Sequence, residues 1–128
     1  YVYSSHFLEH LSKEQAIITL DEIYRVLKPN GIIRIVIPDL DFYINKYLKD
    51  KETINKTKSS DDFIFGLNII TKSRDPHMWM YNSDALIERF KQAGFKNVVK
   101  CEYKKGKCKD VEILDYLPET SLHVEGVK

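Results

Sequence analysis

The stretch that decides the fold is residues 12–39, SKEQAIITLDEIYRVLKPNGIIRIVIPD, which changes halfway from a helical pattern to a strand pattern. Ser12 and Gln15 form a capping box, in which the two side chains satisfy free amides at a helix start. Apolar residues then recur at helical spacing along one face: Ala16, Ile17, Leu20, Ile23, Tyr24 and Leu27. The P-N-G turn at residues 29–31 ends this helix.

Residues 32–37 are nearly all apolar, which predicts a strand covered on both faces, as in a parallel sheet flanked by helices. Tyr and Val within residues 1–5 suit a second, short strand that precedes the helix. A strand, helix and strand of this length form a right-handed crossover. The fold class is therefore expected to be α/β.

Composition excludes several classes of protein. The chain has 128 residues, 43% of them hydrophobic and 30% charged, which is typical of one globular domain. A net charge of +1 gives no general attraction to nucleic acid or to a membrane surface. The lysines between residues 100 and 109 are typical of a solvated turn. No apolar run approaches the roughly 20 residues that span a bilayer. We therefore expect a cytoplasmic protein in which Cys101 and Cys108 are free thiols.

The rest of the chain predicts further helices and strands with one polar interruption. A helix is expected after Asp39, with its apolar face formed by Leu40, Tyr43, Ile44, Tyr47 and Leu48. Residues 49–62 predict a mobile loop, residues 63–70 a short helix, and residues 71–81 an irregular segment. A helix capped by Asn82 or Ser83 is expected to end at Gly94. Strands are expected at residues 98–103 and 122–128, with an irregular stretch between them.

Five motifs occur in a fixed order along the chain. Residues 1–11 read YVYSSHFLEHL, residues 25–31 RVLKPNG and residues 38–40 PDL; HMWMY at 77–81 precedes DALIERF and AGF, and the last eight residues are SLHVEGVK. In this order and spacing they resemble the second half of a class I S-adenosylmethionine (SAM)-dependent methyltransferase. The resemblance is to the type-11-like group found in bacterial polysaccharide gene clusters. It covers the chain except for residues 49–62 and 104–120.

The resemblance implies a partial Rossmann-like sheet. The family's strand order is three, two, one, four, five, seven, six, with strand seven antiparallel, and the strands of this chain correspond to four, five, seven and six. Residues 1–128 are thus expected to form a single domain, the C-terminal portion of a methyltransferase domain that lacks its N-terminal SAM-binding strands. Because the chain begins with Tyr1, we expect a longer parent protein. The exposed strand at residues 1–5 would favour a homo-oligomer.

The resemblance also implies SAM as the cofactor of the complete protein. Ser4, Ser5, His6 and Phe7 would form one wall of its pocket, at the strand end where such sheets bind ligands. The glycine-rich turn that would hold the rest of the cofactor has no counterpart, because the chain has only five glycines and no G-x-G-x-G spacing. The isolated chain is therefore expected to bind SAM poorly and to be inactive alone.

Methyl transfer to a small molecule or sugar is the activity that the resemblance implies, and it depends chiefly on proximity and orientation. His10 or His77 would be the base where the acceptor must lose a proton, since imidazole titrates near neutrality. Asp39, Trp79 and Tyr81 are the candidate acceptor-binding residues, because aromatic rings stack on sugars and planar molecules. The alternatives are local packing for the histidines, a helix cap for Asp39, and a small core for the two aromatic residues.

Two other functions remain as alternatives. His6, Glu9 and His10 match H-x-x-E-H, the inverted zinc-peptidase motif, in which two histidines on a helix bind zinc and the glutamate acts as base. Glu88 or Glu112 would complete that ligand set. Because a strand leads directly into the motif, the main interpretation assigns no metal ligand. The second alternative is a non-catalytic half-domain that self-associates.

Overall fold

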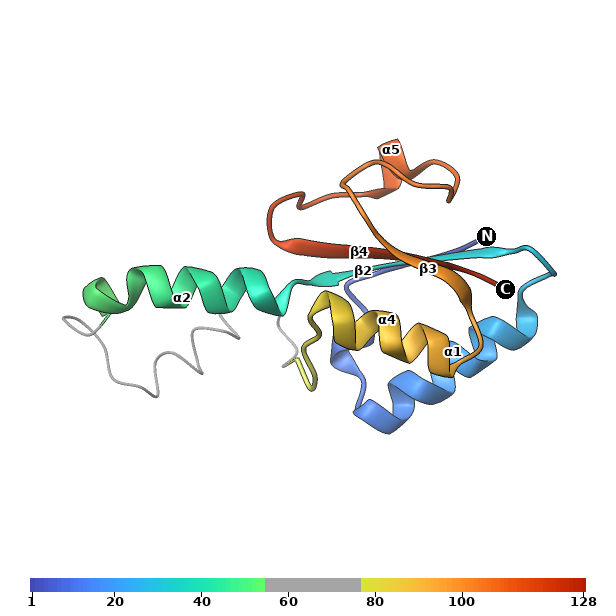
Figure 1. The fold of residues 1–128 in the computed structure, drawn as a ribbon, viewed down its shortest axis with the longest axis horizontal. Coiled ribbons are helices and arrows are strands. Elements are labelled where there is room, and N and C mark those ends of the chain that lie inside the picture. Colours follow the sequence, from blue (N-terminus) through green and yellow to red (C-terminus); the bar gives the residue numbers. More distant parts are fainter. Residues whose placement is uncertain (55–76) are drawn as a thin grey trace.

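A four-stranded sheet with cover on both faces forms the centre of the molecule (Figure 1). The computed structural model describes residues 1–54 and 77–128, with the backbone alone described at positions 47 and 50–54. The strands, in the order β1-β2-β4-β3, are β1 (Val2–Ser5), β2 (Ile32–Pro38), β4 (Ser121–Val127) and β3 (Lys96–Cys101).

Strand direction follows the expected half-sheet. β1 and β2 run parallel, and β4 runs antiparallel to both β2 and β3. This order and the reversed strand confirm the α/β sheet that the sequence predicted. Along β2, every residue after Ile32 is buried, so this strand is covered on both faces as expected. Because β1 is at the end of the strand order, one of its edges has no strand partner among residues 1–54 and 77–128.

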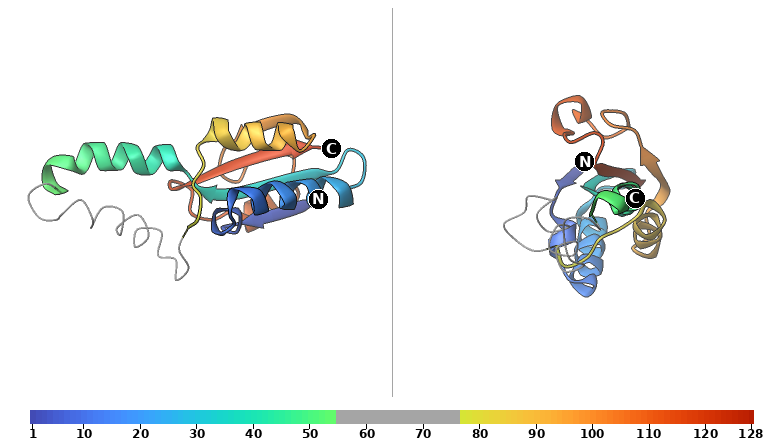
Figure 2. Two further views of the ribbon diagram at one scale, coloured as in Figure 1. Left: turned by 90° about the horizontal axis from the view of Figure 1, so that it is seen from below. Right: turned by 90° about the vertical axis from the view of Figure 1, so that its left-hand side faces the viewer.

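Two helices cover one face of the sheet. α1 (Lys13–Val26) and α4 (Ser83–Gln92) lie side by side across it (Figure 2). The predicted capping box at Ser12 is present, and Asn82 caps α4 by accepting a hydrogen bond from the Ala85 amide at 2.9 Å. The core between helices and sheet includes Ala16, Leu20, Ile33, Ile35, Ile37, Leu86, Phe90, Leu122 and Val124. Burying one large side chain of this kind stabilises the fold by about 1.5–3 kcal/mol.

The turn after α4 follows the prediction. The strand after it ends earlier than the strand predicted at residues 98–103. Gly94 has φ +96°, the left-handed conformation that ends the helix. β3 then begins at Lys96 and ends at Cys101, so Tyr103 lies beyond the strand in which it was expected. The chain turns at Lys104, where φ is 57°.

The opposite face of the sheet is covered by residues 102–120, which include the four-residue helix α5 (Val111–Leu114) (Figure 1). A buried ion cluster attaches this layer to the sheet. Arg34 of β2 donates from Nε to Asp115 Oδ1 at 3.0 Å and from Nη1 to Glu125 Oε1 at 2.8 Å. The three side chains are 0–5% exposed. The sequence analysis did not identify this cluster.

Backbone groups of the covering layer complete the ion cluster. The guanidinium of Arg34 also donates to the carbonyl oxygen of Lys105 at 3.1 Å. The amide of Lys104 donates to Asp115 Oδ2, and that of Lys107 to Glu125 Oε2, each at 2.8 Å. Burial alone would raise the pKa of Asp115, but the hydrogen bonds from Arg34 and the Lys104 amide lower it below its ordinary value.

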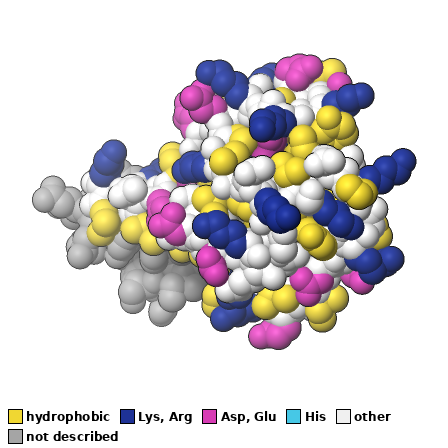
Figure 3. All heavy atoms as spheres, turned by 45° about the vertical axis from the view of Figure 1, so that its right-hand side comes forward, with side chains coloured by type: hydrophobic (Ala, Val, Ile, Leu, Met, Phe, Trp, Pro, Cys, Tyr) yellow, Lys and Arg dark blue, Asp and Glu magenta, His cyan; other side chains and the backbone are white. Residues whose placement is uncertain are grey.

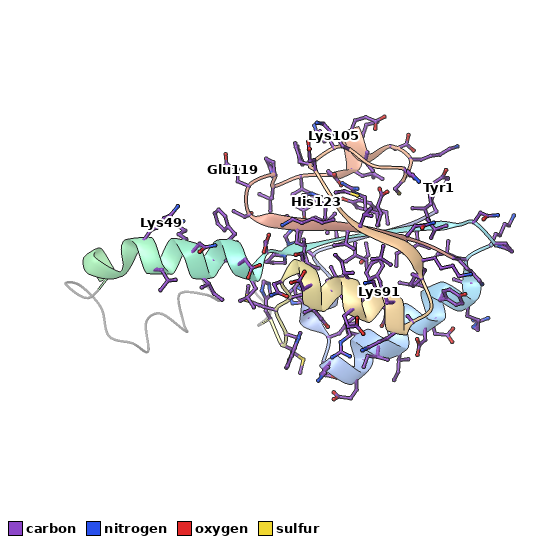
Figure 4. All side chains as sticks on the ribbon, in the orientation of Figure 1. Tyr1, Lys49, Lys91, Lys105, Glu119 and His123 are labelled. Carbon is purple, nitrogen blue, oxygen red and sulfur yellow. The ribbon has the colours of Figure 1, made fainter. Side chains whose placement is uncertain are left out.

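His123 of β4 lies under this layer, beside the ion cluster (Figure 4). Its side chain is 3% exposed, and its Nε2 lies 3.7 Å from Asp115 Oδ2. Burial lowers the pKa of His123, and the positive charge of Arg34 lowers it further, against the opposing effect of Asp115. Burial therefore favours the neutral form of the imidazole.

α2 (Leu40–Ile54) extends beyond the end of β2 and away from the sheet (Figure 1). It continues to Ile54, so the first part of the loop predicted at residues 49–62 is helical. The sequence K-D-K-E at 49–52 is polar, but lysine and glutamate favour helix, and polarity alone was a poor guide. Residues 55–62 and the helix predicted at 63–70 lie outside the described residues.

The described surface carries mixed charge. Figure 3 shows Lys and Arg side chains spread among acidic and apolar ones on one face of the molecule. Cys101 and Cys108 are free thiols, as predicted. Within residues 1–54 and 77–128, no helix is both long and apolar enough to cross a membrane.

We expect Arg34→Met to destabilise the fold by about 3–5 kcal/mol, because it leaves two buried carboxylates without their counter-ion. Chemical denaturation measures this free energy of unfolding. Arg25→Met is the matched control, because Arg25 pairs with Glu22 on the exposed side of α1 and should change stability little. Equal effects of the two substitutions would contradict a structural role for the ion cluster.

We expect stability to fall in two steps as the pH is lowered. The folded-state pKa of His123 is below that of the unfolded chain, so the unfolded state binds its proton first and stability falls below about pH 6.5. The pKa of Asp115 is also lower in the folded protein than in the unfolded chain, so its contribution to stability is lost below about pH 4.

Urea unfolding at several pH values between 7.5 and 5 measures the first step. His123→Gln should reduce the slope of unfolding free energy against pH in this range. The slope should not vanish, because burial lowers the pKa of His77 in the same direction. An unchanged slope in His123→Gln would show that His123 does not titrate as described.

Candidate functional site

Three strand ends meet at one edge of the sheet. The carboxyl ends of β1 and β2 lie together because these strands are parallel, and the antiparallel β4 begins at the same edge. The amide of His6 donates to the carbonyl of Val36 at 2.8 Å, and the amide of Asp39 donates to the carbonyl of Thr120 at 3.0 Å. Ligands of open α/β sheets bind at such carboxyl ends. We call this region, around His6 and Asp39, the functional edge.

A sharp turn follows β1 at the functional edge. His6 has φ 50°, a left-handed conformation that is uncommon outside glycine. The chain then forms the 3-10 helix η1 (Leu8–His10), and α1 starts only at Lys13. The H-x-x-E-H motif is therefore not on an α-helix, which the zinc-peptidase chemistry requires.

The four residues predicted to line the cofactor pocket lie along this turn. Ser4 and Ser5 pair with Ile35 and Val36 of β2. The Oγ of Ser5 is buried and has no hydrogen-bond partner among the described residues. Phe7 is 49% exposed, so its ring is open to a ligand.

His6 faces protein groups with both ring nitrogens. Its Nε2 lies 3.3 Å from Ser121 Oγ, and its ring centroid lies 5.2 Å from that of Tyr116. Its Nδ1 lies 3.3 Å from Glu9 Oε1, within ion-pair distance but without the alignment of a hydrogen bond. The side chain of His6 remains 21% exposed to solvent at the functional edge.

η1 and the segment before α4 are joined through Glu9. Its backbone carbonyl accepts hydrogen bonds from the amides of Met78 at 2.8 Å and Trp79 at 3.1 Å. This contact brings His77 next to His10, with ring centroids 4.9 Å apart and planes at 81°. One ligand atom from each of Glu9, His10 and His77 lies within 4.8 Å of the others. Burial lowers the pKa of His77.

The three predicted acceptor-binding residues have different surroundings. Trp79 is 43% exposed, with the Lys13 ammonium 5.6 Å from its ring centroid. Tyr81 is only 1% exposed and belongs to the hydrophobic core, so its ring offers no free face to an acceptor. This packing favours the alternative, a small core, for Tyr81. Its backbone bridges to Asp39, and its carbonyl accepts a hydrogen bond from the Leu40 amide at 3.1 Å.

Asp39 caps α2, which was the alternative to acceptor binding for this residue. Its Oδ1 accepts from the amide of Asp41 at 3.0 Å, and its Oδ2 lies 3.3 Å from Lys100 Nζ. The side chain is 13% exposed, so it remains within reach of the functional edge. Both of its oxygens already have protein partners.

Sequence reasoning missed two residues at this edge and one contact between segments. Ser121 and Tyr116 come from the C-terminal part of the chain, and no local pattern connects them to His6. The neighbourhood of Glu9 and His77 was also missed, although H-x-x-E-H was recognised as an unusual concentration of ligand-type residues. His10 and His77 were each considered as a base, but not as neighbours.

Comparisons with known proteins agree with the fold. A family model described as methyltransferase domain matches residues 1–100. No curated protein matches the chain. The chain belongs to this methyltransferase domain family.

Solved structures share the fold at low sequence identity. A structure of PigF with SAH has 16% identity and a TM-score of 0.59, and the match covers 98% of this chain and 29% of that one. A SAM-dependent methyltransferase from Archaeoglobus fulgidus has 16% identity and a TM-score of 0.57, covering 99% and 58%. One from Thermotoga maritima has 19% identity and a TM-score of 0.53, covering 98% and 54%. The chain thus spans from under a third to somewhat over half of the length of these structures.

We expect Asp39→Ala to destabilise the protein by about 1 kcal/mol, the usual cost of losing a helix cap. Asp39→Asn should cost less, since its amide oxygen can still accept from Asp41. Thermal or chemical denaturation of the two variants measures the difference. If the two substitutions were equally costly, charge pairing with Lys100 rather than capping would be the main role of the side chain.

Proposed function

We propose that this chain forms one wall of the cofactor pocket and part of the acceptor site of a SAM-dependent methyltransferase that acts on a small molecule or sugar. The observation that carries the proposal is the meeting of β1 and β2 carboxyl ends at one edge, in a chain that belongs to a methyltransferase family. Membership of the family supports methyl transfer as the reaction. The position of His6 and Asp39 supports the functional edge as the site where it occurs.

The turn after β1 fits a contact with the cofactor. Ser5 Oγ is a buried polar atom without a partner among the described residues, and such atoms are ordinarily hydrogen-bonded. The exposed ring of Phe7 can cover an apolar or planar part of a ligand. SAM supplies an electrophilic methyl group on a sulfonium. We propose that Ser4, Ser5, His6 and Phe7 hold that end of the cofactor.

Positioning is the main contribution of this chain to the proposed reaction. A new bond forms between the acceptor oxygen and the methyl carbon as the bond from that carbon to sulfur breaks, and the acceptor proton is released. Proximity and alignment can supply much of the rate of such a displacement. Trp79, which is partly exposed beside the functional edge, is proposed to contact the acceptor. The assignment of His10 or His77 as a base stays a prediction.

The chain covers only one side of the proposed pocket. Residues 4–7 offer one wall, and β1 has an edge without a strand partner among the described residues. We therefore propose that 1–128 binds the cofactor weakly and is inactive when alone. Self-association through β1 is the second candidate function, and the free edge of this strand favours it.

The first experiment is a nuclear magnetic resonance titration of S-adenosylhomocysteine into residues 1–128. We expect shifts confined to the amides of residues 4–7 and their neighbours, with a Kd of about 1 mM or weaker, equivalent to about −4 kcal/mol. Phe7→Ala should abolish these shifts. Ile18→Ala is the matched control, because Ile18 is 61% exposed on α1 and should leave them unchanged.

The outcomes separate the parts of the proposal. An absence of shifts at residues 4–7 under high ligand concentration would contradict the cofactor wall. Micromolar binding would instead contradict the claim that the chain needs further strands to complete the pocket. Sedimentation velocity on the same sample gives the oligomeric state, and a monomer at all concentrations would contradict pairing through β1.

A further inference from the structure

Glu9 is an unusual residue that neither the fold nor the proposed methyl transfer explains. Its side chain is 1% exposed, and both carboxylate oxygens are buried without a hydrogen bond from the part of the chain that the structure describes. Buried carboxylates are ordinarily paired or bound to a metal, because an isolated buried charge is costly. Each buried carboxylate of the Arg34 cluster, by contrast, accepts hydrogen bonds from Arg34 and from backbone amides.

Three imidazoles lie close to Glu9. His10 Nδ1 is also buried without a partner among the described residues, and His77 lies against His10. A carboxylate oxygen of Glu9 and one nitrogen of each histidine lie within 4.8 Å of one another. The Nδ1 of His6 is 3.3 Å from Glu9 Oε1, on the side of the functional edge. Three donors of metal-ligand type therefore converge, and two of them have unused polar atoms.

The backbone holds these donors in place. Glu9 and His10 are on η1, while His77 is at the start of the segment whose next two amides donate to the Glu9 carbonyl. This double hydrogen bond fixes the distance between the two parts of the chain, although 67 residues separate His10 from His77. The ligands of a metal site need this kind of support from their backbones.

We propose that Glu9, His10 and His77 bind a divalent first-row transition metal ion, with Zn²⁺ as the ion to test. Two imidazoles and one carboxylate match the ligand preference of Zn²⁺ and its neighbours and differ from the all-oxygen sites of Ca²⁺ and Mg²⁺. Three protein ligands leave a fourth position for water or a substrate oxygen, as in catalytic zinc sites.

The geometry needs only a small closure around the ion. Ligands about 2.1 Å from a tetrahedral zinc lie about 3.4 Å from one another, so donors that lie within 4.8 Å must approach by up to about 1.4 Å. Rotation of the two half-buried histidine side chains is the movement that the proposal requires. The ion would also give the Glu9 carboxylate a counter-charge.

This site differs from the H-x-x-E-H arrangement of zinc peptidases. His77 replaces His6 as the second imidazole ligand, and Glu9 is a ligand instead of a base. His6 stays outside, between Glu9 and Ser121, where it can orient the carboxylate. Metal binding and base catalysis are exclusive uses of His10 and His77, so a metal bound there would exclude their use as a base.

An ion at this place would serve the proposed methyl transfer, and this consequence alone rests on the proposed function. An acceptor hydroxyl bound at the fourth position would lose its proton more readily, because a zinc ion lowers the pKa of a bound water or hydroxyl. The chain would thereby select acceptors whose hydroxyl can reach the ion.

The test is a zinc titration of metal-free 1–128, followed by competition with a chromophoric chelator. We expect one ion per chain, and a loss of affinity of at least about 100-fold in Glu9→Gln and in His77→Ala, the upper end of what removing a residue that only orients a ligand costs. Glu14→Gln and His123→Gln are the matched controls, since these residues lie outside the cluster, and they should bind zinc as the unchanged chain does. Circular dichroism checks that each variant is folded.

Substitution with Co²⁺ and the imidazole resonances of the unchanged chain give readouts that do not depend on any variant folding. Zinc should shift the imidazole signals of His10 and His77 and leave that of His123 in place. The inference is overturned by an absence of binding, by binding that survives both Glu9→Gln and His77→Ala, or by a thiolate-to-cobalt charge-transfer band, which would place the ion on a cysteine. None of these readouts involves SAM, so the inference and the proposed function fail separately.

Discussion

The attachment of residues 102–120 to the sheet depends on a single guanidinium. Arg34 is in the middle of the central strand β2, on the face opposite the helices, and it binds one carboxylate from the covering loop and one from β4. Gly106 passes so close to Arg34 and Glu125 that a side chain there would overlap both. The path of residues 102–120 over the sheet follows from this cluster. The loop in turn places Tyr116, which directly follows Asp115, and the start of β4 beside His6, so the ion cluster also affects which groups lie at the functional edge.

Most of the fold was predictable because its signals are local. The capping box at Ser12 and the apolar run at 32–37 each specify a structure within a few residues, and Gly94 ends its helix by the same kind of local rule. Arg34 interrupts the apolar run, but nothing near it in the sequence indicates its partners, which are 81 and 91 residues away. A buried ion cluster of this kind requires knowledge of the tertiary structure. The helical continuation at 49–54 was missed for another reason, because charged residues suit a solvated helix as well as a loop.

The functional edge was predictable only in part, for the same reason. The turn after β1 could be found because strand residues lead directly into S-S-H-F, and its position follows from the resemblance and the sheet topology. The burial of Tyr81 could not be predicted, since an aromatic segment before a helix suits either a core or a binding surface. The pairing of His10 with His77 depends on two hydrogen bonds to the Glu9 carbonyl, and backbone contacts of this sort leave no trace in residue type. The edge therefore combines a locally encoded turn with neighbours that only the folded chain brings together.

The position of Arg34 also affects the nascent chain. Ile32 to Ile37 without its arginine would be a short, uncharged, β-branched segment of the kind that forms intermolecular sheets. Its two carboxylate partners are translated about 80–90 residues later, roughly 4–18 s at ordinary elongation rates. During that interval the positive charge interrupts the segment and disfavours aggregation, a gatekeeper role. The residue that later joins the two layers of the folded protein thus first protects the unfolded strand from other chains.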